Sequence, residues 1–178
     1  MPDNQQRASK ILARLNQFEK LLTIAAFIVL VLVVFADVVS REVQDAGLFW
    51  ASQTGVWANV IVVMAGFGLA SSAGAHLRPR FADQWLPASW HATIETLQHL
   101  VMALFCLSLG LLASRVVAGS WQLGELSLDL FLPVWPIQLF LPLAFLAGTL
   151  RHALYACYPS LRPIESNSTA FVAEDDHR

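Results

Sequence analysis

The sequence predicts an all-α integral membrane protein with four transmembrane helices, and three observations lead to that prediction. Hydrophobic residues make up 56% of the 178 positions, and the mean hydropathy is +0.56. Charged residues make up only 13%, against about 25% in soluble domains. Four long windows contain no Asp, Glu, Lys or Arg at all. A net charge of −2 without a basic block argues against a nucleic-acid binder, and two cysteines without CxxC spacing argue against a disulfide scaffold.

The first uncharged window, Leu21–Ala36, predicts a span over about residues 21–40. About 20 apolar residues cross a hydrocarbon core roughly 30 Å thick. Residues 1–20 precede it as a cytoplasmic amphipathic segment. An apolar stripe at helical spacing runs from this segment into the span and consists of Ile11, Leu12, Leu15, Phe18 and Leu22. We expect a helix on the membrane surface that leads into the first span, the alternative being a simple basic flank.

The other three windows are Ala46–Ala75, Thr96–Ser114 and Leu130–Leu150. They predict spans over about residues 55–75, 96–115 and 131–151. These spans must be helices, because lipid offers no partners for backbone groups. The predicted membrane domain covers residues 21–158, with an aromatic interfacial stretch between the second and third spans. The polar residues 159–178 are expected to form a disordered cytoplasmic tail.

The orientation follows from the eleven Lys and Arg residues. Nine lie in the segments on the side of the two termini, and only Arg41 and Arg115 lie on the other side. Because cytoplasmic segments carry an excess of basic residues, both termini are predicted to lie in the cytoplasm.

Asp37 and Arg41 are the charged residues at the far end of the first predicted span. They are four residues apart and therefore share a helix face. An ionisable residue in a span is a candidate functional group, although a structural pair that fixes the helix position is the commoner outcome. No charged residue falls in the middle of any predicted span, which argues against ion coupling by this chain alone.

Small residues recur at four-residue spacing in the second span, at Gly66, Ala70 and Gly74. Such a face lets helix backbones approach closely, either inside this chain or against another protein. The fourth span begins with Pro133 and Trp135, and it contains Pro142, which should kink or open the helix. A kink can line a binding site in transporters, but a static kink for packing is more common.

The remaining candidate groups do not form a catalytic arrangement. His76, His99 and His152 lie near the predicted cytoplasmic span ends, without an evident pairing that would hold a haem. No nucleophile and base occur together, and no phosphate-binding loop is present. We therefore expect neither an enzyme nor a bound cofactor or metal.

The order of these motifs resembles the small membrane subunit of tripartite ATP-independent periplasmic (TRAP) transporters, the DctQ-like family. Asp37-Val-Val-Ser-Arg41 is followed by Trp50, then by Gly66-x-Gly-x-Ala70 and His76-Leu-Arg78. A Leu-Pro-Val-Trp-Pro segment opens the fourth span, and Arg151 follows that span. The acidic residues that usually follow the family's Trp are replaced here by Ala51-Ser52-Gln53.

The resemblance implies a subunit that braces a large membrane subunit in the bacterial inner membrane. The large subunit carries the substrate and sodium sites, and a periplasmic solute-binding protein delivers a small organic solute, with organic acids as the default class. Gly66, Ala70, Gly74, Pro133, Trp135 and Pro142 are then candidate subunit-packing residues. Asp37, Arg41 and Trp50 are candidate contacts at the periplasmic rim, and His76 and Arg78 lie at the cytoplasmic interface. Two alternatives are a stand-alone homo-oligomeric transporter and a haem-binding electron-transfer subunit.

Overall fold

The computed structural model describes residues 3–73 and 91–162, and four of its helices are long and apolar enough to cross a membrane. This confirms the prediction of an all-helical chain with four spans. The helices are α1 (Asp3–Gln44), α2 (Ala51–Ser72), α3 (His91–Leu123), the short α4 (Trp135–Gln138) and α5 (Phe140–Cys157), followed by the 3₁₀ turn η3 (Pro159–Leu161). Within the described residues there is no β-strand, and one isolated bridge joins Leu126 to Pro133.

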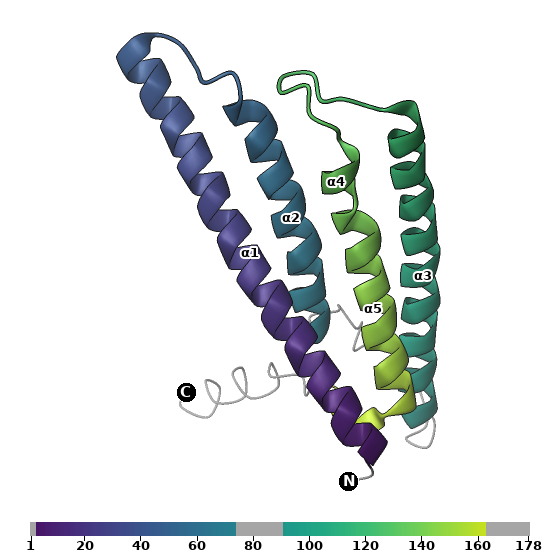
Figure 1. Ribbon diagram of the computed structural model, residues 1–178. Helices are drawn as coiled ribbons and strands as arrows, with labels where there is room; N and C mark the ends of the chain where they lie inside the picture. Colours follow the sequence, from purple (N-terminus) through teal and green to yellow (C-terminus); the bar gives the residue numbers. More distant parts are fainter. Residues whose placement is uncertain (1–2, 74–90, 163–178) are drawn as a thin grey trace, which may run out of the picture.

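The first helix is much longer than the predicted span. Its 42 residues correspond to about 63 Å, which is roughly twice the thickness of the hydrocarbon core. The helix is unbroken across residue 20, so the amphipathic segment and the first span are one continuous helix (Figure 1). The location of residues 1–20 on the membrane surface stays a prediction.

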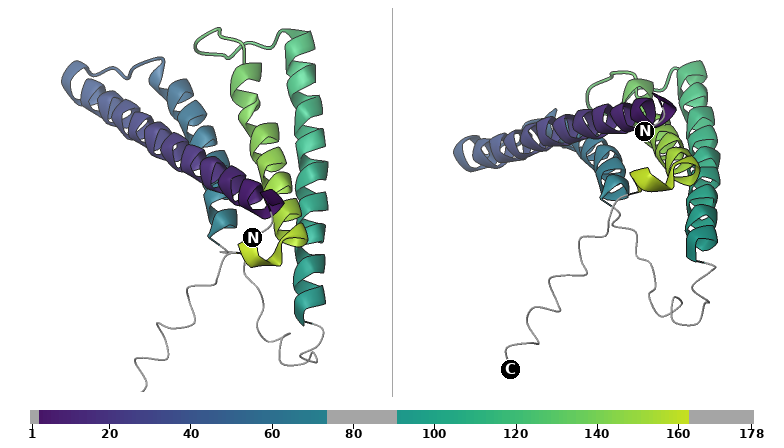
Figure 2. Two further views of the ribbon diagram at one scale, coloured as in Figure 1. Left: turned by 60° about the horizontal axis from the view of Figure 1, so that its bottom comes forward. Right: turned by 90° about the horizontal axis from the view of Figure 1, so that it is seen from below.

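The helices are arranged as two pairs and do not form a closed bundle. α1 packs along α2, and α3 packs along α5, while α2 and α5 join the two pairs (Figures 1 and 2). We call the end with the start of α1 and the last turns of α2 and α5 the terminal end. The opposite end, with the connections 45–50 and 124–134, is the loop end. The pairs meet at the terminal end and diverge toward the loop end (Figure 1).

The fourth span is interrupted near its start, as its prolines predict. α4 ends at Gln138 and α5 begins at Phe140, with Leu139 between them. Pro142 has no N–H group, so the carbonyl of Gln138 loses the donor that a regular helix would supply. The interruption therefore lies one turn before the proline, which is itself buried.

The faces that pack inside the chain are built from small residues. The buried positions of α2 are Ala51, Gly55, Ala58, Ala65, Gly68 and Ser71. Large apolar side chains point outward instead, among them Phe27 and Phe35 of α1 and Leu104 of α3. This distribution is typical of membrane helices, which pack through small residues and expose apolar side chains to lipid or to a partner.

Candidate functional site

A buried ion pair joins α1 to α5 at the terminal end. Arg151 Nη2 lies 2.5 Å from Glu19 Oε2, and the side chains are only 1% and 8% exposed. The Nη1 group of Arg151 donates a hydrogen bond of 2.6 Å to the carbonyl oxygen of Gly68 on α2. One guanidinium group therefore connects three helices.

The sequence places both charges where burial requires pairing. Glu19 lies between Leu15 and Leu22, on the apolar stripe of α1, and Arg151 lies near the end of the apolar α5. An unpaired charge in such surroundings is costly, whereas a pair with additional hydrogen bonds compensates much of the desolvation. The pair brings together residues 132 positions apart in the sequence.

Two histidines extend this arrangement to the remaining helix. His152 is fully buried, and its Nε2 atom lies 3.0 Å from the hydroxyl oxygen of Ser71 on α2. Its Nδ1 atom lies 3.1 Å from Nδ1 of His99 on α3. We call the set Glu19, Gly68, Ser71, His99, Arg151 and His152 the polar cluster. It links all four spanning helices at one end of the molecule.

Gly68 is the position where α1 and α2 approach most tightly within this cluster. A Cβ atom built at Gly68 would overlap the carboxylate of Glu19. That carboxylate is held by Arg151 and cannot move aside without breaking the ion pair. The absence of a side chain at residue 68 is therefore a condition for the buried pair.

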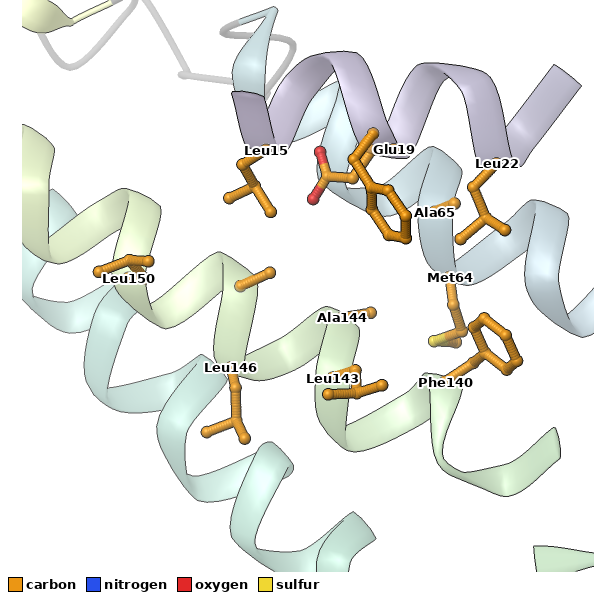
Figure 3. A pocket seen from close by; sticks show the side chains of 12 residues that line it. Leu15, Glu19, Leu22, Met64, Ala65, Phe140, Leu143, Ala144, Leu146 and Leu150 are labelled. Atoms are coloured by element: carbon orange, nitrogen blue, oxygen red, sulfur yellow. The ribbon is translucent and has the colours of Figure 1, made fainter. Parts of the chain in front are cut away.

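An apolar pocket lies beside the polar cluster, between α1, α2 and α5. Its volume is about 440 Å³, and Glu19 is the one charged residue among those that line it (Figure 3). Met64 and Ala65 contribute from α2, and Phe140 and Leu143 contribute from α5. The pocket is suited to apolar groups, because its walls offer few polar atoms.

The loop end carries a different ion pair, which stays within one helix. Arg41 Nη2 lies 2.7 Å from Asp37 Oδ2, and the Arg41 side chain is 67% exposed. Asp37 Oδ1 also accepts a 2.8 Å hydrogen bond from the N–H of Leu48. Ser40 donates a 2.8 Å hydrogen bond to the carbonyl oxygen of Ala46. These contacts hold the connection 45–50 against the end of α1, with the partly exposed Trp50 directly before α2.

The predicted packing residues face away from the chain's own helices in α2. A Cβ atom at Gly66 would meet no atom of the described residues within 4 Å, and Ala70 is exposed. The sequence left open whether this face packs inside the chain or against another protein, and no described residue packs against Gly66 within that distance. Gly74, His76 and Arg78 lie outside the described residues.

The predicted residues of the fourth span occupy three different settings. Pro133 is exposed in the connection before α4, while Pro142 is buried in α5. The ring of Trp135 packs edge-on against Trp121 at the end of α3, with 4.6 Å between the ring centroids. Trp135 thus fixes the start of α4 to α3 inside this chain. Roles of these residues toward another subunit stay predictions.

The polar cluster was not predicted from the sequence. One signal for Glu19 was available, because it is an acidic residue inside the apolar stripe of α1. Arg151 and His152 could have been noted as adjacent ionisable residues in the last turns of an apolar helix. Their partners could not be assigned, since they come from different helices. Within the described residues, no group of three or more His, Cys, Asp or Glu side chains could hold a metal ion.

Comparison with known proteins identifies a family to which this chain is related. A comparison with the curated proteins found no match. The family model described as "Tripartite ATP-independent periplasmic transporters, DctQ component" matches residues 30–160, which is well over half of the chain. This component works with a large membrane subunit and a solute-binding protein, and its family consists of transporter subunits and not of enzymes. The chain therefore belongs to the DctQ family, the small membrane subunits of TRAP transporters.

Proposed function

We propose that this chain braces the large transport subunit of a TRAP transporter in the bacterial inner membrane, with both termini in the cytoplasm. The transporter imports a small organic solute, by preference an organic acid, at the expense of a sodium gradient. The small subunit binds neither the solute nor the ion in this proposal. It stabilises the large subunit and presents its loop end to the solute-binding protein.

The observation that carries this proposal is the placement of charge along the described helices. Glu19 and Asp37 are separated by 18 residues of α1, or about 27 Å, which is close to the thickness of the hydrocarbon core. No charged residue lies in the uncharged window 21–36 between them, and α2 carries none in its whole length. The described membrane interior thus lacks the charged groups that a transporter uses to move ions or carboxylates.

The outward surface supports a bracing role. Among the described residues no atom lies within 4 Å of a Cβ built at Gly66, Ala70 is exposed, and large apolar side chains cover the outer sides of α1 and α3. A surface of this kind allows a neighbouring membrane helix to approach closely, since association in lipid depends on packing between small residues.

Uptake by reconstituted proteoliposomes tests the proposed function. Liposomes that contain this chain, its large membrane subunit and the solute-binding protein should accumulate labelled small carboxylates when a sodium gradient is applied. Omission of this chain should abolish most of the uptake, and replacement of sodium by potassium should do the same. Uptake by this chain alone would favour a stand-alone transporter and would overturn the proposal.

A single substitution tests the bracing face separately. Gly66→Leu should release the large subunit during purification in detergent, because a bulky side chain prevents close approach of a partner helix. Gly66→Ala is the matched control and should retain the complex. A complex that stays intact with Gly66→Leu would show that this face does not bind the large subunit.

A further inference from the structure

The two histidines of the polar cluster share one hydrogen bond through identical atoms. The Nδ1 atoms of His99 and His152 are 3.1 Å apart, and the rings come from α3 and α5. In a hydrogen bond between two such nitrogens, one carries the proton and the other accepts it. If both nitrogens carried protons, two donors would face each other and the contact would open.

The second nitrogen of His152 has its own partner. Nε2 lies 3.0 Å from Ser71 Oγ, so His152 connects α5 both to α2 and to α3. A consistent assignment has His99 Nδ1–H donating to His152 Nδ1, while Nε2–H of His152 donates to the hydroxyl oxygen of Ser71. His152 is neutral in this arrangement, and His99 carries either one or two protons.

Two ion pairs of the described residues lie near the two histidines. From α1, Glu19 faces the cluster, but its charge is balanced by Arg151 of α5 at 2.5 Å. From α3, Glu95 precedes His99 by one turn, and Arg162 lies 2.9 Å from its carboxylate. α2 has no charged residue, and α5 contributes the hydroxyl of Tyr155 among its described side chains. A second imidazolium would lie in a buried site 3.1 Å from the first, and the two like charges would repel each other.

We infer that the two hydrogen bonds His99–His152 and His152–Ser71 form a proton-sensitive contact, here called the latch, that holds α3 to α5 and α2. The latch is closed when at most one of the two imidazoles is charged. It opens when acidification protonates both, and α3 then loses its histidine contact with α5, while Arg162 still holds Glu95 of α3. Histidine is the side chain that ordinarily changes charge between pH 5 and 8, the range in which such a latch would respond. This inference concerns the chain itself and does not depend on the solute that the transporter carries.

The direction of the pH effect follows from the protons bound in each state. Unfolded, both imidazoles are free to take up protons as the pH falls. Folded, the closed latch excludes at least the second proton. The unfolded state therefore binds more protons at low pH, and stability rises with pH through this window. A difference of one bound proton changes the folding equilibrium constant about tenfold per pH unit.

Unfolding of the full chain in lipid nanodiscs tests the latch. The equilibrium should be measured between pH 5 and 8 for the wild type and for His152→Gln. The amide of Gln can accept from Nδ1–H of His99 and donate to the hydroxyl oxygen of Ser71, but it does not titrate. His99 can then take up its second proton in both the folded and the unfolded state, so the pH slope should fall by most of its value. The matched control His177→Gln removes an imidazole from the end of the sequence and should keep the slope of the wild type. Equal slopes for the wild type and for His152→Gln would overturn the inference.

A spectroscopic measurement keeps the inference testable if His152→Gln does not fold. In the full chain labelled with ¹⁵N-histidine, one of the two Nδ1 atoms should be protonated and the other should accept its hydrogen bond at pH 8. At pH 5 both Nδ1 atoms should carry protons and the hydrogen bond between them should be absent. Two unprotonated Nδ1 atoms at pH 8, or an unchanged hydrogen bond at pH 5, would contradict the latch.

Discussion

The two ion pairs at opposite ends of the molecule differ in what they connect. Glu19 and Arg151 are buried, come from α1 and α5, and add the carbonyl of Gly68 on α2 to their contacts. Asp37 and Arg41 lie on the same face of α1, with Arg41 largely exposed. The first pair holds helices together, whereas the second holds a connection at the end of one helix.

This contrast explains why the molecule is joined at one end and open at the other. At the terminal end, the polar cluster supplies directional contacts between all four spanning helices. At the loop end, Asp37 contacts Arg41 of its own helix and the N–H group of Leu48 in the following connection, and the helix pairs diverge (Figure 1). A chain of this shape leaves apolar faces available for another subunit while its own helices stay connected.

The largest predicted effect is at Arg151. Replacement by Met leaves the carboxylate of Glu19 buried without its partner, which should cost about 3–5 kcal/mol of the free energy of unfolding. Denaturant titration in detergent micelles measures this loss. The matched control is Arg115→Met on the exposed side of α3, which should stay within about 0.5 kcal/mol of the wild type. Equal effects of the two substitutions would refute the distinction between the two environments.

Replacing two glycines of α2 by alanine should change the stability of the chain by intermediate amounts and in different directions. Gly68→Ala should destabilise the chain by about 1–3 kcal/mol, because the new methyl group displaces the held carboxylate of Glu19. Gly66→Ala should be neutral or stabilise by up to about 1 kcal/mol, since Ala favours helix and the position is open. Thermal unfolding of both variants in the same detergent measures these changes. A lower unfolding midpoint for Gly66→Ala than for Gly68→Ala would contradict the assignment of the packed face.

Arg41→Glu at the loop end should have the smallest effect on stability and a clear effect on transport. Its side chain is largely exposed, so its loss removes no contact between helices. A negative charge at this rim should weaken docking of the solute-binding protein, in keeping with the bracing role proposed above. The unfolding midpoint should fall only slightly, because the new carboxylate lies four residues from Asp37, and the yield of the complex should not change, while uptake in proteoliposomes falls. Full uptake would exclude Arg41 from docking.

Local patterns in the sequence were sufficient for the spans, for the family resemblance and for the pair at the loop end. The four uncharged windows correspond to the four spanning helices, because exclusion of charge from lipid acts on each segment separately. The contact between Asp37 and Arg41 follows from a spacing of four residues on one helix. The interruption of the helix near the start of the fourth span follows from the missing N–H group of Pro142.

The polar cluster could not be predicted in the same way. Glu19 and Arg151 are 132 residues apart, and no single-helix periodicity relates them. The spacing of Gly66, Ala70 and Gly74 indicated a small-residue face, but the face buried inside the chain contains Gly68 and Ser71. Which face of α2 turns inward depends on the helices that pack against it. Here Arg151 of α5 contacts α2 through the carbonyl of Gly68.

A double-mutant cycle on Glu19 and Arg151 tests most directly whether the terminal end holds the helices together. The unfolding free energy should be measured for Glu19→Leu, for Arg151→Met and for the double variant. We expect each single variant to be strongly destabilised and the double variant to recover much of the loss, since no buried charge is left unpaired. The coupling energy should then be at least about 2 kcal/mol. Single effects that add to within about 0.5 kcal/mol would contradict the account.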